Sequence, residues 1–190
     1  MEKILFDYIE NYMSLSEEEK QIIKDLSLIK TFKKGDVLLE KGKKSNDNYF
    51  VLKGCLRCYY IKDGEEKTTE FYTELEGLTP PCVKDGSYSQ YYISCVEDTV
   101  ILVSNTESEI ESFAKFPKFE SMCRALAEQL ATKTKVEFDN FKTSSPEERY
   151  LSLIENRPDL LQRAPQHQLA SYLGITPQSL SRLRDRLVKK

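Results

Sequence analysis

Residues 166 to 187 of the sequence read Gln166-His167-Gln168-Leu169-Ala170-Ser171-Tyr172-Leu173-Gly174-Ile175-Thr176-Pro177-Gln178-Ser179-Leu180-Ser181-Arg182-Leu183-Arg184-Asp185-Arg186-Leu187. Ala170 is small enough to let two helices approach closely, and Gly174, four residues later, can adopt the positive φ of a sharp turn. Thr176 is a favourable N-cap, and Pro177 suits the first position of a second helix. The residues expected to fill the core between the two helices are Leu169, Leu173, Ile175, Leu180 and Leu183. The stretch therefore predicts two helices joined by a tight turn, a helix-turn-helix.

The second of these helices has a polar face that suits nucleic acid. With its leucines directed inward, Gln178, Arg182 and Arg186 share the opposite side at steps of four residues. Arginine can bridge two acceptors of guanine, glutamine can pair with adenine, and the amides at the start of the helix can accept a phosphate. We expect double-stranded DNA as the partner, contacted by Thr176, Gln178, Ser179, Arg182, Arg186 and Lys189. The competing interpretation is a helical hairpin with a solvated basic face, because the same shape also serves packing.

The charge of the chain is divided unevenly. Its 190 residues carry a net charge of -3, which by itself does not favour nucleic acid. From Lys142 to Lys190, however, nine Lys and Arg stand against five Asp and Glu, which leaves a charge of -7 on residues 1 to 141. Only charges near phosphates release counterions on binding, so this division suits a C-terminal part that approaches DNA. The same excess also keeps a small domain soluble.

The part of the chain before residue 105 indicates strands preceded by two short helices. Residues 31 to 103 contain short runs of β-branched and aromatic residues, separated by turn signals such as the hairpin dipeptide Asp63-Gly64. Many short strands at regular intervals are typical of a sandwich or barrel. The apolar spacing between Ile4 and Leu28 indicates the helices, and Ser16 and Glu19 stand in a capping-box arrangement before the second.

Helical spacing returns after Asn105 and continues in one long helix that begins near Pro117. Ser145 and Pro146 then end the pattern and cap a new helix. The apolar stripe of the long helix is narrow and favours a coiled-coil-like dimer seam over packing inside the chain. The residues of this stripe are Phe119, Met122, Leu126 and Leu130. We expect an α+β fold with a strand-rich domain and N-terminal helices at residues 1–112, which the family resemblance described next implies is a β-roll sensor domain, a connecting and dimerisation helix at 113–143 and the helix-turn-helix domain at 144–190.

With these elements in order, the chain resembles the cyclic-AMP receptor and fumarate/nitrate regulator (Crp/Fnr) family over essentially its whole length. The resemblance rests on Tyr49-Phe50-Val51-Leu52 before Lys53-Gly54, on the long helix, on the segment from Ile175 to Arg186 and on the glycines of the strand-rich region, Gly35, Gly42, Gly54 and Gly64. It implies a jelly roll of the cyclic nucleotide-binding type and a homodimer on a two-fold-related DNA site. We therefore expect a dimeric, sequence-specific DNA-binding transcription regulator.

The sequence departs from the pattern of this family at two places. Members that bind a cyclic nucleotide carry an Arg-Ser or Arg-Thr pair for the phosphate, whereas Ser89-Gln90 stand there without a guanidinium. We therefore do not expect cyclic AMP to bind. An unidentified small-molecule effector remains possible in a pocket of Tyr72, Ser89, Gln90 and Tyr91, although aromatic residues on strands more often form core. The chain also ends soon after Leu187, so we expect no full β-hairpin wing.

Other functional classes lack their signatures. Cys55 and Cys58 are the only close cysteine pair, and residues three apart on a strand point to opposite faces, so we expect no metal and no cofactor. The single histidine, His167, cannot supply the several imidazoles of a metal-binding barrel enzyme, and triad and Walker motifs are missing, so we expect no enzyme. The alternative function is a β-roll protein that binds an effector or a protein partner and whose helix-turn-helix does not read DNA specifically. Scattered cysteines and the lack of a long apolar run predict a cytoplasmic chain that does not enter membranes.

Overall fold

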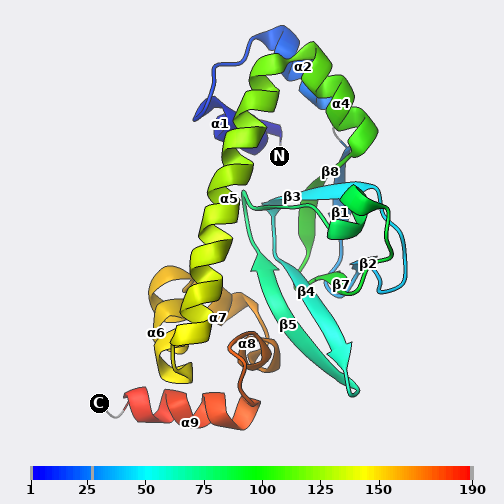
Figure 1. The fold of residues 1–190 in the computed structure, drawn as a ribbon. Coiled ribbons are helices and arrows are strands. Elements are labelled where there is room, and N and C mark those ends of the chain that lie inside the picture. The colour runs from blue at the N-terminus through cyan, green and yellow to red at the C-terminus, as the bar shows by residue number, and fades with distance from the viewer. Residues whose placement is uncertain (1, 27, 189–190) are drawn as a thin grey trace.

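The computed structural model describes residues 2–26 and 28–188, and it shows a strand-rich unit and a helical unit connected by one long helix (Figure 1). The strands lie between residues 28 and 105, and helices form both ends of the chain. The fold is α+β, with an N-terminal jelly roll, a long connecting helix and a C-terminal helical unit, so the predicted fold class is confirmed.

Two short helices, α1 (Glu2–Glu10) and α2 (Glu17–Leu26), precede the jelly roll. The predicted capping box is present at the start of α2, where the Ser16 amide donates to the Glu19 carboxylate at 2.7 Å and the Glu19 amide donates to the Ser16 hydroxyl at 3.2 Å. Both helices direct apolar side chains onto strand residue Leu52, with Ile9 and Ile23 buried in the contact. These helices therefore cover one end of the roll.

The jelly roll consists of two four-stranded sheets whose neighbouring strands are all antiparallel. One sheet has the order β1 (Leu28–Phe32), β8 (Thr99–Asn105), β3 (Asp47–Lys53) and β6 (Gly77–Leu78). The other has the order β2 (Val37–Leu39), β7 (Tyr92–Cys95), β4 (Leu56–Lys62) and β5 (Glu65–Tyr72), and α3 (Pro81–Asp85) lies between β6 and β7 in the chain. Side chains of both sheets meet in one core, in which Leu56, Ile93 and Ile101 are fully buried.

Two turns of the roll depend on glycine. Asp63 and Gly64 both have positive φ, at 54° and 78°, which is the geometry of the tight hairpin that the sequence predicts between β4 and β5. Gly54, between β3 and β4, has a φ of 106°, and a Cβ there would lie 2.5 Å from Thr99 Oγ1. Only glycine fits at that crossing because the neighbouring strand approaches so closely.

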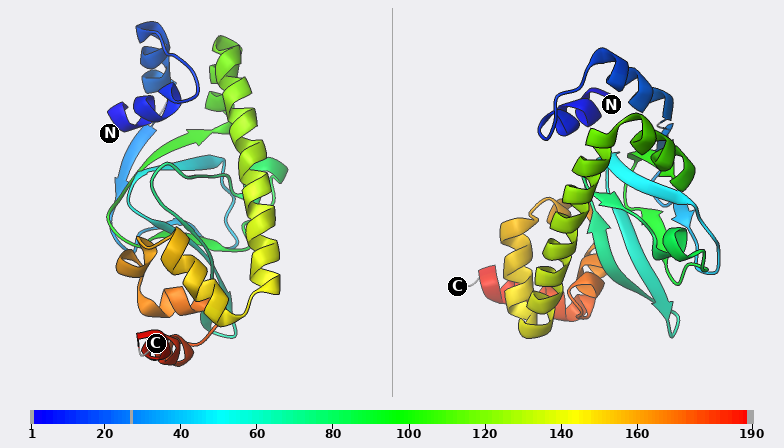
Figure 2. Two further views of the ribbon diagram at one scale, coloured as in Figure 1. Left: turned by 90° about the vertical axis from the view of Figure 1, so that its left-hand side faces the viewer. Right: turned by 45° about the horizontal axis from the view of Figure 1, so that its top comes forward.

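Six helices follow the roll: α4 (Thr106–Lys115), α5 (Pro117–Thr143), α6 (Pro146–Asn156), α7 (Leu160–Arg163), α8 (Gln166–Tyr172) and α9 (Pro177–Val188). Figure 2 shows α5 running along one side of the roll, from the N-terminal helices to the C-terminal unit. Ser145 caps α6, accepting the Glu148 amide at 3.3 Å, as predicted. Within the described residues, no helix is long and apolar enough to cross a membrane.

The apolar stripe of α5 is divided between two environments. Phe119 and Met122 are half-buried and pack against the cluster of α1, α2 and β3 inside the chain, and their part in a dimer seam stays a prediction. Leu126 borders a surface hollow of about 410 Å³ between α5 and the segment that joins α1 to α2. Leu130, further along, is 47% exposed, and no residue of α5 is buried. The N-terminal half of the stripe therefore contacts residues of the same chain, and Leu130 is the most exposed of the four stripe residues.

Candidate nucleic-acid interface

The turn between α8 and α9 has the geometry that the sequence predicts. Gly174 has a φ of 70°, and the Ile175 amide donates to the Ala170 carbonyl at 2.9 Å across the turn. Ala170 is fully buried where the two helices meet, so a larger side chain has no room there. A Cβ on Gly174 would lie 3.2 Å from Cζ of Phe141, at the end of α5. The turn is therefore fitted both to its own helices and to α5.

Thr176 forms the N-cap of α9. Its hydroxyl accepts the Ser179 amide at 3.2 Å and donates to the Ser179 hydroxyl at 3.0 Å. This contact leaves the first amides of the helix directed outward, where they favour an anion. Ser179 stays exposed and keeps hydrogen-bonding capacity beyond this contact.

The leucine face of α9 is buried, as predicted. Leu180 is fully buried and Leu183 is 4% exposed, and both pack with Leu169 and Leu173 in a core that extends to α6 and α7. Ile175 and Leu187 pack at its edge. This core is continuous, so it fixes the rotation of α9 about its own axis.

The opposite face of α9 presents its polar residues to solvent. Gln178, Ser179 and Arg182 are exposed together, as predicted. Arg186 is exposed as well and lies 3.6 Å from the Glu147 carboxylate. Lys189 falls outside the described residues. Four of the predicted DNA-contacting side chains therefore lie on one open surface, next to the capped end of the helix at Thr176.

Two arginines that sequence reasoning did not single out support this surface. Arg184 does not point to solvent but donates to the Tyr150 hydroxyl at 3.1 Å, which ties α9 to α6. Arg149 of α6 donates to the carbonyls of Leu173 at 3.0 Å and Ser144 at 2.7 Å and stacks on the Phe141 ring at 4.5 Å. The arginine therefore joins the end of α5, the start of α6 and the end of α8. No local sequence signal marks this role, because the partners of Arg149 are backbone atoms of other elements.

The predicted effector residues lie together on the roll but do not line either of the two described hollows. Ser89 is buried and donates to the Tyr91 carbonyl at 2.8 Å within its own turn, whereas Gln90 is exposed. Tyr72 and Tyr91 are half-buried against the roll core, and burial raises the pKa of both hydroxyls. The two tyrosines therefore form a partly covered aromatic surface, while Ser89 and Gln90 make hydrogen bonds to backbone carbonyls of their own turn.

The cysteines behave as structural thiols. Cys55 belongs to the core under the C-terminal unit and Cys58 to the core of the roll, so the pair points to opposite faces as expected. Burial raises the pKa of Cys55 to about 12 and that of Cys58 further, which keeps both protonated near neutrality. Among the described residues, no cluster of three or more His, Cys, Asp or Glu side chains has the arrangement of a metal site.

Comparison with known proteins finds a family model that matches the roll. Residues 29–113 match the family model of the cyclic nucleotide-binding domain. No curated protein sequence matches the chain.

Solved structures resemble the chain over most of its length. Catabolite Activator Protein of Thermus thermophilus has 19% identity and a TM-score of 0.56, covering 94% of this chain and 86% of its own. CooA of Carboxydothermus hydrogenoformans, as a mutant, has 18% identity and a TM-score of 0.70, covering 95% and 83%. The c-di-GMP responsive global regulator CLP of Xanthomonas campestris has 14% identity and a TM-score of 0.70, covering 92% of both chains. Residues 29–113 are therefore similar to a cyclic nucleotide-binding domain, and the chain shares its fold with these three solved structures over most of its length.

Proposed function

We propose that this chain is a sequence-specific DNA-binding transcription regulator that acts as a homodimer. The observation that carries the proposal is the exposed polar face of α9, where Gln178, Ser179 and Arg182 stand opposite a buried leucine face. Because that core seats the helix firmly, its polar side chains can enter a major groove as one unit. Two of the proteins that share this fold are a catabolite activator protein and a global regulator that links cell-cell signalling to virulence gene expression, which supports the same role here.

The side chains of this face divide by role. Arg182 and Gln178 carry the donors and acceptors that distinguish guanine and adenine from the other bases. Thr176, beside the first amides of α9, and Arg186, near its end, suit backbone phosphates on either side. Arg186 must exchange its contact with Glu147 for a phosphate, which favours binding at low salt.

The open part of α5 supplies the dimer contact. Leu130, Phe138 and Phe141 are 47%, 54% and 46% exposed, although the Phe141 ring also contacts Arg149 within the chain, and their spacing places them within about a quarter turn of one another around the helix. Three large apolar side chains on one helix face are unfavourable in water and suit the same face of a second chain. Leu126 lies at the border of this face, beside the hollow along α5.

The jelly roll serves as the effector domain but does not bind cyclic AMP in this proposal. No guanidinium stands at Ser89-Gln90 to receive a cyclic phosphate, and the Ser89 hydroxyl is used within its own turn. The effector of this roll is a molecule without a phosphate, which binds against the half-buried Tyr72 and Tyr91.

Selection from a random pool of DNA duplexes at two salt concentrations tests the function. We expect enrichment of an inverted repeat, with binding that weakens steeply as salt rises. The substitution Arg182→Ala should relax the preference at one position in each half-site. A matched control with the same loss of charge is Lys3→Ala, at an exposed residue of α1.

Retention of duplexes without sequence enrichment would contradict the proposal. The same holds if Arg182→Ala and Lys3→Ala leave identical sequence preferences. Either result would favour the alternative function, a roll that binds an effector or protein partner beside a helix-turn-helix without specific DNA contacts.

A further inference from the structure

The C-terminal unit, α6 to α9, is docked on the jelly roll and does not hang freely from α5 (Figure 1). Helix α8 lies on strand β5, where the Thr68 amide donates to the Ser171 hydroxyl at 2.9 Å and that hydroxyl donates to the Glu66 carbonyl at 3.1 Å. The rings of Phe71 and Tyr172 meet edge to face, 5.3 Å apart. One helix of the helix-turn-helix is thus bonded to the hairpin β4–β5.

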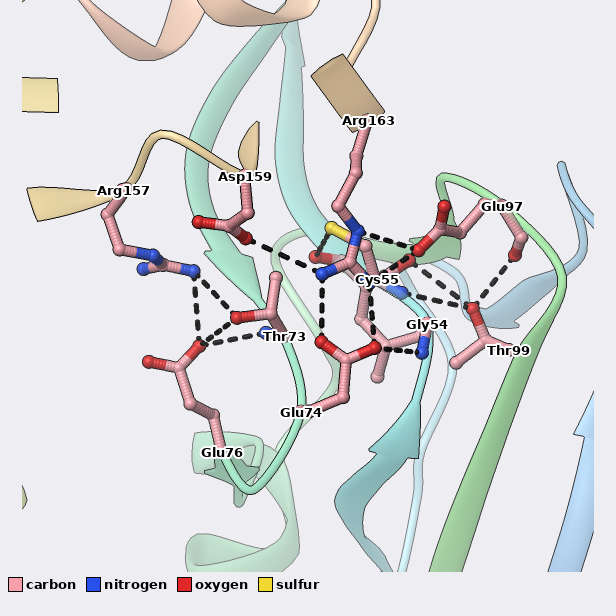
Figure 3. A network of polar contacts seen from close by, with 11 residues as sticks. Gly54, Cys55, Thr73, Glu74, Glu76, Glu97, Thr99, Arg157, Asp159 and Arg163 are labelled. Atoms are coloured by element: carbon pink, nitrogen blue, oxygen red, sulfur yellow. Dashed lines mark hydrogen bonds and ion pairs between the residues drawn. The ribbon is translucent and has the colours of Figure 1, made fainter. Parts of the chain in front are cut away.

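A second contact joins α7 to two turns of the roll, and Figure 3 shows its side chains. Arg163 at the end of α7 binds both oxygens of Glu74, at 2.8 and 2.9 Å, and donates from Nε to Glu97 at 2.9 Å. Glu74 lies in the turn after β5 and Glu97 in the turn after β7. A bidentate guanidinium pair of this kind has a fixed direction as well as a charge, so it specifies a pose.

A third contact lies beside it (Figure 3). Arg157, between α6 and α7, donates to the Glu76 carboxylate at 3.3 Å and to the Thr73 hydroxyl at 3.1 Å. The roll holds these carboxylates in place, because Glu76 accepts the Thr73 amide and Glu74 accepts the Gly54 amide, each at 2.8 Å. Backbone amides of the roll therefore hold the Glu74 and Glu76 carboxylates in place, independently of the two arginines.

Burial and charge both favour these pairs over ordinary surface pairs. The side chains of Arg163 and Arg157 are only 20% and 22% exposed, and Glu76 is 27% exposed. Burial alone would lower the pKa of Arg163 and raise that of Glu74, but their mutual hydrogen bonds outweigh it in both directions. Partly buried, hydrogen-bonded pairs are screened less by salt than exposed pairs, which contribute little.

We infer that Arg157 and Arg163 with Glu74, Glu76 and Glu97 form a latch that fixes the pose of the C-terminal unit on the roll, and that the latched pose is the one that binds DNA. The inference rests on the proposed function. The latch engages α7 and the segment before it, whereas Gln178 and Arg182 on α9 stay exposed, so the latched pose leaves the reading face open.

The latch acts through the geometry of the dimer. Two half-sites are read together only if both units hold the same orientation relative to the α5 seam. Without the latch, the unit keeps its contacts with α5 and β5 but holds its orientation less firmly, so each unit loses more orientational freedom when it binds DNA. Opening the latch should therefore weaken binding to paired half-sites and leave binding to one half-site nearly unchanged.

The double variant Glu74→Gln and Glu97→Gln tests the latch in the full-length chain. Glutamine keeps an acceptor for Gly54 but removes the charge that Arg163 binds. The matched control is Asp98→Asn with Glu65→Gln, which removes two carboxylates of the roll that pair with lysines and not with the C-terminal unit. We expect the latch variant to bind duplexes with paired half-sites about tenfold more weakly than the control variant, and both to bind a duplex with one half-site scrambled equally.

Simple electrostatics makes the opposite prediction, since removing negative charge should strengthen binding to DNA in both variants alike. Equal or tighter paired-site binding by the latch variant would therefore overturn the inference. Amide exchange in the free protein separates this failure from failure of the proposed function. Peptides that contain Thr68 should exchange faster in the latch variant than in the control, whether or not any DNA is bound, and unchanged exchange would show that no latch exists.

Discussion

Gly174 is the residue whose replacement best tests the turn of the helix-turn-helix. Gly174→Ala should lower the free energy of unfolding by about 2 kcal/mol, because its φ is 70° and the added Cβ would lie 3.2 Å from Phe141. Gly64→Ala is the matched control, since its φ is 78° but a Cβ there meets nothing within 4 Å, so it should cost only about 1 kcal/mol. Urea denaturation measures both, and equal losses would mean that the contact with Phe141 is unimportant.

Arg182 and Arg184 lie two residues apart, but replacing each with alanine should affect a different property of the protein. Arg182 is exposed, so Arg182→Ala should leave stability unchanged and reduce discrimination at one base position by about 1–3 kcal/mol. Arg184 donates to the Tyr150 hydroxyl, so Arg184→Ala should lower stability by about 1 kcal/mol and leave base preference intact. Thermal melting and competition binding on mutated half-sites separate the two effects. A loss of stability in Arg182→Ala would place its side chain in the core instead.

Glu70 on strand β5 lies where the roll, α5 and the C-terminal unit meet. Burial, and then Glu137 and Glu76, raise the pKa of Glu70 from its ordinary 4.5 to about 7, against the opposing effect of Arg157 and Lys133. The charged and titratable groups that interact with it are Glu137 and Lys133 of α5, Arg157 after α6, Glu76 in the turn after β5, Tyr72 of β5, Tyr172 of α8 and Cys58 of β4. A carboxyl with a raised pKa favours the folded contact fully below about pH 4.5, and this contribution is lost as pH rises through 7.

The melting temperature of the chain should therefore fall between pH 6 and pH 8 partly because Glu70 ionises in this contact. Glu70→Gln removes the ionisation and should flatten the dependence over that window, while Glu155→Gln, at an exposed position of α6, should leave it as in the unaltered chain. Melting curves across the window decide the matter. The idea is refuted if Glu70→Gln and the unaltered chain lose stability in parallel.

Elements with local signals could be predicted from the sequence, and those without could not. The helix-turn-helix was predictable because Ala170, Gly174 and Thr176 stand at the spacing that this motif needs for close helix packing, a turn with positive φ and an N-cap. Strand β6 has only two residues and α3 only five, too few to show a period. Strand β1 is almost wholly exposed along its length, so it lacks the alternation that marks a half-buried strand.

Some residues of the candidate site could also be predicted from the sequence and others could not. Its exposed residues on α9 follow from helical periodicity, but the arginines that position the C-terminal unit do not. Arg163 binds Glu74, which lies 89 residues earlier in the chain, and a lone arginine in a helix gives no sign of such a partner. Likewise the periodicity of α5 shows an apolar stripe but not which surface covers it, and Phe119 and Met122 prove to be covered from within the chain.

We expect the exposed apolar residues of α5 to form the contact of the proposed dimer. Leu130→Asp places a charge in the face formed with Phe138 and Phe141, so it should shift the protein from dimer to monomer in sedimentation equilibrium. Val136→Asp is the matched control, because Val136 is also exposed, at 53%, but lies about 120° around the helix axis from Leu130.

Loss of the dimer should change how the protein binds an inverted repeat, whereas loss of a single DNA contact should not. A monomer brings one copy of α9 to an inverted repeat, so Leu130→Asp should bind the paired duplex no better than a duplex with one half-site scrambled. The Val136→Asp variant should keep the full preference for the paired duplex. If Leu130→Asp remains a dimer with undiminished paired-site affinity, the seam lies on another surface, and the orientation of the two reading helices must then be set by contacts other than those along α5.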